Sequence, residues 1–135
     1  MTKHLVIPDT QVKPDSNTEH LTWAGKYAVA MKPDVIIHLG DHWDFPSLSS
    51  YDKGKKSFEG RRYQADVKSG KKAMEAFLAP IKEEQERLRT NKHKLWKPKL
   101  VFLLGNHENR ITRAVEDSPE LEGLMSFDDL GLEKM

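Results

Sequence analysis

The chain has 135 residues, of which 37% are hydrophobic and 32% are charged, and its formal net charge is +1. This length suits one domain with a modest core beneath a heavily charged surface. We expect neither a transmembrane segment nor a signal peptide, because no apolar run approaches about 20 residues and the N-terminus lacks an apolar leader. The absence of cysteine excludes disulfide scaffolds and thiolate metal sites, and it favours a cytoplasmic protein whose metal ligands are nitrogen or oxygen atoms.

Three short apolar runs, residues 4–7, 34–39 and 99–104, predict β-strands. Each run is rich in branched residues and is followed at once by a polar turn. Because these runs do not alternate with polar residues, they are typical of strands that are buried on both faces of a parallel sheet.

Helical periodicity fills the segments between these runs. Over residues 16–32, N-capping residues precede apolar positions spaced three and four apart, and a Lys-Pro pair ends the pattern. A longer pattern over 63–88 contains Pro80, which predicts a kink or two segments. We expect a short helix over 110–116 and only weak structure after Ser118. The expected buried face of the first helix consists of His20, Leu21, Ala24, Tyr27, Ala28 and Met31.

The resulting order, β-α-β-α-β, predicts an α/β fold for residues 1–135 as a single domain. Parallel strands joined by right-handed helical crossovers are the expected arrangement, giving a mostly parallel sheet. A long loop over residues 44–60 follows the second strand, and loops of that length in compact domains are often functional.

Charge is distributed unevenly. Residues 52–72 contain eight Lys or Arg and three Asp or Glu, whereas residues 114–135 contain seven acids and one Lys. A solvated helix face and an acidic tail explain this pattern, and a surface that binds a polyanion is the alternative.

Aromatic residues alternate with cations after the second strand. This pattern indicates either nucleic-acid binding, in which rings stack on bases, or a loop that its aromatic residues hold over the sheet edge. These residues are Trp43, Phe45, Tyr51 and Phe58, with Lys53, Lys55, Lys56, Arg61 and Arg62.

Polar clusters follow all three predicted strands. They are Asp9-Thr10-Gln11, then Gly40-Asp41-His42-Trp43-Asp44, then Gly105-Asn106-His107-Glu108. Each cluster alone resembles an ordinary turn. Together they would meet at one edge of the sheet, because ligands of open α/β sheets bind beyond the carboxyl ends of the strands.

These side chains suit a site with two divalent metal ions. Carboxylate and amide oxygens and imidazole bind manganese, iron or zinc, and two ions can contact both the attacking and the leaving oxygens of a phosphate ester. Asp41 would bridge the ions, and a water activated by them would become the nucleophile. His107 could protonate the leaving oxygen, with Asp44 orienting its ring.

The three clusters resemble the calcineurin-like metallophosphoesterase family, whose pattern is D-x-H, G-D-x-x-D and G-N-H-[ED]. The resemblance extends from about Leu5 to Asn109. The chain is also similar to small phosphoesterases that phages encode, which would work in the host cytoplasm. It implies the first half of an α/β/β/α sandwich. It also implies metal ligation by Asp9, Asp41 and Asn106, and an acid role for His107 with Asp44 as its partner.

The chain departs from the family pattern in two ways. Gln11 stands where the family usually has His, which shifts the expected metal towards manganese or magnesium, with iron or zinc as alternatives. The family also supplies histidines from its second half, including G-H-x-H, and this chain has no histidine after His107. We therefore expect a domain that is incomplete relative to that family.

Three further residues have a structural interpretation, and two others have both a functional and a structural one. We expect His38 to pack in the core and His93 to lie on the surface. His42 would face a substrate phosphate or solvent. Glu108 would cap the following helix, and Arg110 would either bind a substrate phosphate through its planar fork or lie exposed on a helix.

The leading hypothesis is a metal-dependent phosphoesterase acting on phosphomonoesters or phosphodiesters, nucleic acid among them. The alternative is a half-domain, impaired in catalysis, that acts by binding: its exposed edge would be apolar and would favour self-association or a complementing C-terminal segment. A phosphate-binding module without catalysis is disfavoured because both common glycine-rich phosphate loops are absent. A haloacid-dehalogenase-type phosphatase is disfavoured because no second aspartate follows Asp9 two residues later.

Overall fold

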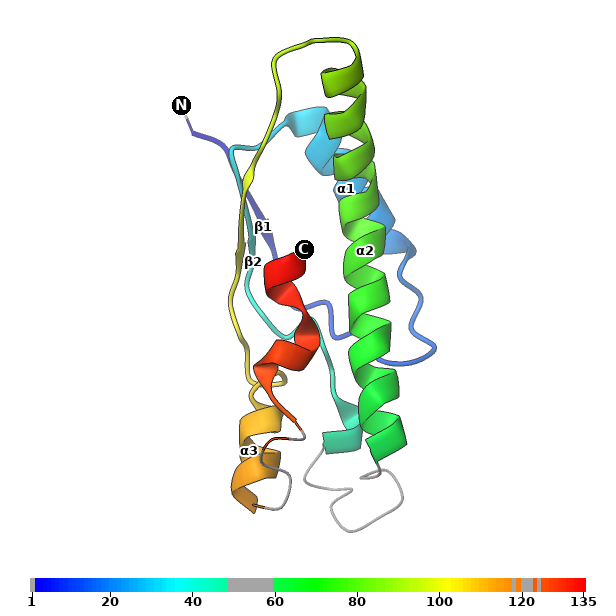
Figure 1. The fold of residues 1–135 in the computed structure, drawn as a ribbon, viewed down its shortest axis with the longest axis vertical. Helices are drawn as coiled ribbons and strands as arrows, with labels where there is room; N and C mark the ends of the chain where they lie inside the picture. The colour runs from blue at the N-terminus through cyan, green and yellow to red at the C-terminus, as the bar shows by residue number, and fades with distance from the viewer. Residues whose placement is uncertain (1, 49–59, 118, 120–122, 124) are drawn as a thin grey trace.

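A computed structural model describes residues 2–48, 60–117, 119, 123 and 125–135. Its strands β1 (His4–Ile7), β2 (Val35–His38) and β3 (Lys99–Phe102) form one sheet in the order β1-β2-β3, and both neighbouring pairs are parallel. The predicted α/β fold and parallel sheet are confirmed (Figure 1). The second and third strands end earlier than predicted, so polar turns begin soon after the last paired residues.

Helices α1 (Glu19–Met31), α2 (Gly60–Thr90) and α3 (Arg110–Asp117) alternate with the strands. The short 3-10 helices are η1 (Pro46–Leu48), η5 (Phe127–Leu130) and η6 (Leu132–Lys134). The boundaries of α1 follow the sequence prediction, because Asn17 Oδ1 accepts the Glu19 N–H at 3.0 Å and Lys32 ends the helix in the left-handed region. Among the described helices, none is long and apolar enough to cross a bilayer.

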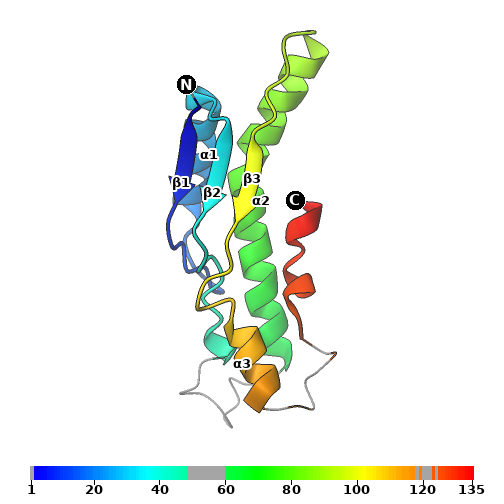
Figure 2. The same ribbon diagram turned by 90° about the vertical axis from the view of Figure 1, so that its left-hand side faces the viewer.

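The long helix α2 contains Pro80 without breaking. Of the two predicted alternatives, the division into two segments is wrong and the kink is confirmed, because Figure 2 shows that the upper part of α2 is inclined to its lower part. A proline in a helix interior removes one backbone hydrogen bond and bends the axis. The bend occurs where α2 crosses α1, since a Cβ on Gly25 would lie 3.2 Å from Pro80 Cδ.

The face of α1 that packs on α2 matches the predicted one only in part. Leu21 and Ala28 are buried as predicted and Gly25 is buried as well, whereas Tyr27 is 54% exposed and Met31 is 44% exposed. The reason is the close approach of the two helices, because a Cβ on Gly25 would lie 2.2 Å from the Phe77 carbonyl oxygen. Small residues permit this contact, and it turns the larger side chains outward.

Helices α1 and α2 cover one face of the sheet, and Figure 2 looks onto the other face, with the helices behind. Ile7, Ile36 and His38 point towards the helices and are buried. On the opposite face Val6 remains 48% exposed, and Leu103, which continues the same alternation beyond β3, is 48% exposed. The prediction that the strands are buried on both faces is therefore wrong for the described part of the chain.

A second apolar cluster lies beyond the carboxyl ends of the strands. It consists of Trp43, Phe45, Leu48, Tyr63, Val67, Ile111, Ala114, Met125 and Leu130. The tail contributes more than its weak sequence pattern predicts, since Leu130 is 0% exposed and Asp129 Oδ2 accepts hydrogen bonds from the Tyr63 hydroxyl at 2.5 Å and the Ser126 N–H at 3.1 Å. The candidate site rests on this cluster.

Gly25→Ala should destabilise the protein by about 1 to 3 kcal/mol, because the new methyl group would overlap backbone atoms of α2 and overpacking has costs of that size. Urea unfolding measures the change. As a control, Ala30→Leu enlarges an exposed residue of the same helix with another good helix former and should change stability by less than about 0.5 kcal/mol. Equal effects of the two substitutions would contradict the close helix contact.

Candidate functional site

The loops that follow β1 and β2 are joined through their main chains. Gln11 N–H donates to the Asp41 carbonyl oxygen at 2.8 Å, and Val12 N–H donates to the His42 carbonyl oxygen at 2.6 Å. Asp44 N–H returns to the Val12 carbonyl oxygen at 2.9 Å. These bonds extend the parallel pairing of β1 and β2 beyond the sheet, so the first two polar clusters lie side by side.

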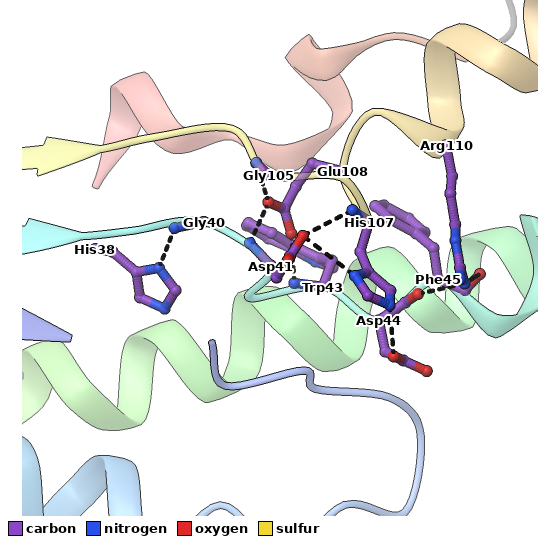
Figure 3. Close-up of polar contacts among 10 residues, drawn as sticks. All are labelled: His38, Gly40, Asp41, Trp43, Asp44, Phe45, Gly105, His107, Glu108 and Arg110. Carbon is purple, nitrogen blue, oxygen red and sulfur yellow. Dashed lines mark hydrogen bonds and ion pairs between the residues drawn. The ribbon is translucent and has the colours of Figure 1, made fainter. Parts of the chain in front are cut away.

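Glu108 joins the second polar cluster to the third (Figure 3). Its Oε1 accepts the N–H groups of Asp41 at 2.7 Å and Gly105 at 2.9 Å, and its Oε2 accepts the Trp43 N–H at 2.8 Å. The side chain is 0% exposed. The prediction that Glu108 caps the following helix is wrong, because its carboxylate connects two loops instead.

The environment of Glu108 acts on its pKa in two directions. Burial raises the pKa above the ordinary value for glutamate, whereas the N–H groups of Gly105, Trp43 and Asp41 lower it in part. All three partners are donors. The ionised carboxylate therefore satisfies them best, since it is purely an acceptor.

Glycine is required on both sides of this junction. Gly40 has φ +98 and Asp41 has φ +55, so the chain turns sharply in the left-handed region directly after β2. A Cβ on Gly105 would lie 2.4 Å from Asp41 Oδ1. The third loop can approach the Asp41 carboxylate only because Gly105 has no side chain.

His107 lies between the carboxylates of Asp41 and Asp44, as Figure 3 shows. Its main-chain N–H donates to Asp41 Oδ1 at 2.7 Å, its Nδ1 is 3.2 Å from the same oxygen, and its Nε2 is 3.5 Å from Asp44 Oδ1. The three side chains are 16–23% exposed. Although Nδ1 is buried and near Asp41, it has no hydrogen-bond partner among the described residues.

A polar hollow of about 460 Å³ opens beside this group, and Asp41 and Asn106 both line it. Asn106 is exposed. Asp9 and Gln11, the other predicted metal ligands, are exposed on the neighbouring loop and do not line this hollow. The structure thus groups Asp41, Asn106 and His107 closely, and the main chain of Gln11 is bonded to that of Asp41.

The donors at this hollow are compatible with a hard divalent cation. Within the described residues, no three His, Asp or Glu side chains form a cluster that could hold a metal ion. Any ion would therefore need amide oxygens as well. Asn106 offers one at this hollow beside Asp41, and Asp9 and Gln11 would have to reach the ion from the neighbouring loop. The unpartnered Nδ1 of His107 next to Asp41 also suits a site that a ligand completes.

Behind the site, a chain of hydrogen bonds links the first loop to α2. Thr10 Oγ1 lies 3.0 Å from His38 Nε2 and 2.6 Å from His42 Nδ1, and His42 Nε2 lies 2.8 Å from the Gly70 carbonyl oxygen. The Gly40 N–H contacts His38 Nδ1 at 3.0 Å. His38 packs in the core as predicted, whereas the prediction that His42 faces substrate or solvent is wrong because His42 is 0% exposed.

Donor and acceptor capacities fix the direction of this chain. Gly40 N–H must donate to His38 Nδ1, so His38 carries its proton on Nε2 and donates it to Thr10 Oγ1. The Gly70 carbonyl can only accept, so His42 also carries its proton on Nε2, and its Nδ1 accepts the Thr10 hydroxyl. Every member is satisfied when both rings are neutral, and burial lowers the pKa of each histidine to about 4.

Arg110 braces the loop after β2. Its Nη1 donates to the carbonyl oxygens of Asp44 at 2.9 Å and Phe45 at 3.2 Å, and the side chain is partly buried, so the interpretation as a freely exposed helix arginine is wrong. Its binding of a phosphate remains a prediction.

Trp43 and Phe45 are 0% exposed and cannot stack on bases. The other residues of this prediction are outside the part of the chain whose side chains the structure describes: Tyr51, Lys53, Lys55, Lys56, Phe58, Arg61 and Arg62.

Comparisons with known proteins find distant relatives in phages. The chain is 33% identical over 79 residues to the Gene 54 protein of Mycobacterium phage L5, and 32% identical over 78 residues to that of Mycobacterium phage D29. Each match covers 58% of this chain and 29% of the relative, so the chain spans well under half of these proteins. No family model matches the chain, and no solved structure does.

Glu108→Gln should destabilise the protein by about 1 to 3 kcal/mol, because an amide offers one oxygen to three N–H donors and leaves a buried donor unpaired. Urea unfolding measures this loss. Glu116→Gln removes the same charge from an exposed position on α3 and serves as the control. A Glu108→Gln protein as stable as this control would contradict the role of Glu108.

Thr10→Val should cost about 2 kcal/mol or more, since it leaves His38 Nε2 and His42 Nδ1 without their buried partner. Thr10→Ser keeps the hydroxyl and should retain most of the stability. Thermal unfolding in a chelator compares the three proteins without any metal contribution. Equal losses for Val and Ser would show that the hydroxyl is not the important group.

The stability of the metal-free protein should fall as the pH drops from 6.5 towards 4. Over this range the unfolded chain binds protons on histidines that stay neutral when folded, so each buried imidazole contributes a slope of about 1.4 kcal/mol per pH unit. His42→Gln should reduce the slope by about one proton, whereas His93→Asn, at an exposed position, should leave it unchanged. Equal slopes for wild type and His42→Gln would refute this assignment.

Proposed function

We propose that the chain is a metal-dependent phosphoesterase that hydrolyses phosphomonoesters or phosphodiesters. The observation that carries the proposal is the position of His107 between two carboxylates, 3.2 Å from Asp41 and 3.5 Å from Asp44. Asp41, which His107 contacts, lines a hollow together with Asn106. A proton donor held next to a residue that could bind a metal ion is what hydrolysis of an oxygen ester requires.

In this proposal His107 is the acid that protonates the leaving oxygen. Asp44 beside Nε2 would orient the ring, and the imidazole would give a proton to the ester oxygen as its bond to phosphorus breaks. The hydrogen bond from the His107 main chain to Asp41 Oδ1 fixes the acid relative to the carboxylate that lines the hollow. Such positioning is a large part of catalysis by enzymes of this kind.

Two divalent ions, manganese first and iron, zinc or magnesium as alternatives, would supply Lewis-acid activation of water and of the phosphoryl oxygens. Asp41 would contact both ions through its carboxylate. Asn106 would bind one ion, and Asp9 and Gln11 would bind the other. The amide ligands favour a hard ion over a soft one.

His107→Ala should lower kcat for phosphate esters by about 10²- to 10⁴-fold, the usual contribution of general acid catalysis. The loss should be larger for phenyl phosphate than for p-nitrophenyl phosphate, because a good leaving group needs less protonation. Hydrolysis with added Mn²⁺ measures both, and His93→Ala is the matched control at an exposed histidine. Equal activity of wild type, His107→Ala and Asp41→Asn would contradict the proposal.

A second candidate function rests on the uncovered face of the sheet. Val6, Leu39 and Leu103 are 47–48% exposed there, which is typical of a surface that a partner covers. In this alternative the chain is a half-domain, poor in catalysis, that binds a complementing segment or a second copy. Sedimentation at micromolar concentration discriminates: a monomer that hydrolyses esters with Mn²⁺ would exclude this alternative.

A further inference from the structure

A second hollow lies on the other side of the first loop from the candidate centre. It has a volume of about 390 Å³ and is formed between the segment that leads into α1 and the side of α2. In Figure 1 this segment crosses α2 on its way from β1 to α1. The lining residues are Val12, Lys13, Asp15, Ser16, Thr18, Ala65, Lys68, Ser69, Lys72 and Ala73, and none of them lines the hollow at Asp41.

The charge of this hollow is positive. Lys68 and Lys72 are one helical turn apart on α2, and Lys13 faces them from the loop, against a single acid, Asp15. Among the described residues these three lysines form no ion pair, in contrast to Lys32, which pairs with Glu84. Ser16, Thr18 and Ser69 also line the hollow, where the Ser16 hydroxyl accepts the Lys13 N–H at 3.1 Å and the Ser69 hydroxyl donates to the Asp66 carbonyl oxygen at 2.8 Å. Ammonium groups around an open cavity are the chemistry that binds a phosphate.

The hollow is rigidly connected to the candidate centre. Lys13 follows Gln11 by two residues, and Val12 between them is 1% exposed and bridged to Trp43. On the other wall, the Gly70 carbonyl lies between Lys68 and Lys72 in the chain and accepts His42 Nε2 at 2.8 Å. Both walls are therefore held by residues that adjoin Asp41.

We propose that this hollow binds a phosphate group through Lys13, Lys68 and Lys72. The phosphate comes either from a neighbouring nucleotide of a nucleic-acid strand whose ester lies at the candidate centre, or from a small phosphate compound. The first source rests on the proposed function, whereas binding itself does not require hydrolysis.

The test is a binding measurement in excess chelator, so that no ester is cleaved. A fluorescein-labelled single-stranded oligonucleotide is titrated with wild type, with Lys68→Gln/Lys72→Gln, and with Lys26→Gln/Lys82→Gln, which removes two exposed lysines elsewhere on α1 and α2. The first pair should weaken binding by about tenfold and reduce the slope of log K against log salt by about 0.7, the value for the one phosphate contact that the hollow makes. The control pair should do neither, and Asp15→Asn should strengthen binding.

Inorganic phosphate at constant ionic strength distinguishes the two sources. If phosphate raises the melting temperature of wild type but not of Lys68→Gln/Lys72→Gln, while the oligonucleotide binds both proteins alike, the hollow serves a small compound. If both pairs of substitutions act alike on the oligonucleotide and phosphate has no lysine-dependent effect, the proposal is overturned. If the wild type does not hydrolyse p-nitrophenyl phosphate, the proposed function is refuted, whereas binding at the hollow is unaffected by that result.

Discussion

The Glu108 carboxylate, which has no exposed surface, accepts N–H groups from both of the loops that follow β2 and β3. The position of Asp41 depends on it, because a residue with φ +55 needs its main chain held by its surroundings. His107 precedes Glu108 in the chain and donates its own N–H to Asp41. One buried acceptor therefore sets the distance between the proposed acid and the proposed metal-bridging carboxylate.

Two further connections support the same loops from other directions. The Thr10 hydroxyl joins His38 and His42 in a fully satisfied chain that ends on α2, and Arg110 holds the carbonyl oxygens of Asp44 and Phe45 from α3. Beneath them Trp43 and Phe45 fill the second apolar cluster, so this loop is anchored by its aromatic residues. The site is thus assembled by contacts between loops, and the sheet only brings their starting points together.

Sequence reasoning predicted the strands and their parallel order, because short branched runs separated by helical periodicity admit few other arrangements. It also predicted that Asp41, Asp44 and His107 lie together, since carboxyl ends of parallel strands share one edge. The roles of Glu108, His42 and Arg110 were missed. Glu108 reaches Asp41 across 67 positions, and such bonds depend on loop geometry that no local pattern encodes. Gly25 likewise decides which side of α1 packs, although a pattern of apolar residues ignores it.

Three loops, joined by Glu108 and Thr10, carry the oxygen donors of the proposed metal site. Titration of Mn²⁺ into the ¹⁵N-labelled protein tests it directly, because the paramagnetic ion broadens nearby amide signals. If the ion binds at these loops, the signals of Gln11, Asp41 and Asn106 disappear first, at substoichiometric Mn²⁺. Broadening that begins in the acidic tail around Asp128 and Asp129, with the three loops unaffected, would contradict it.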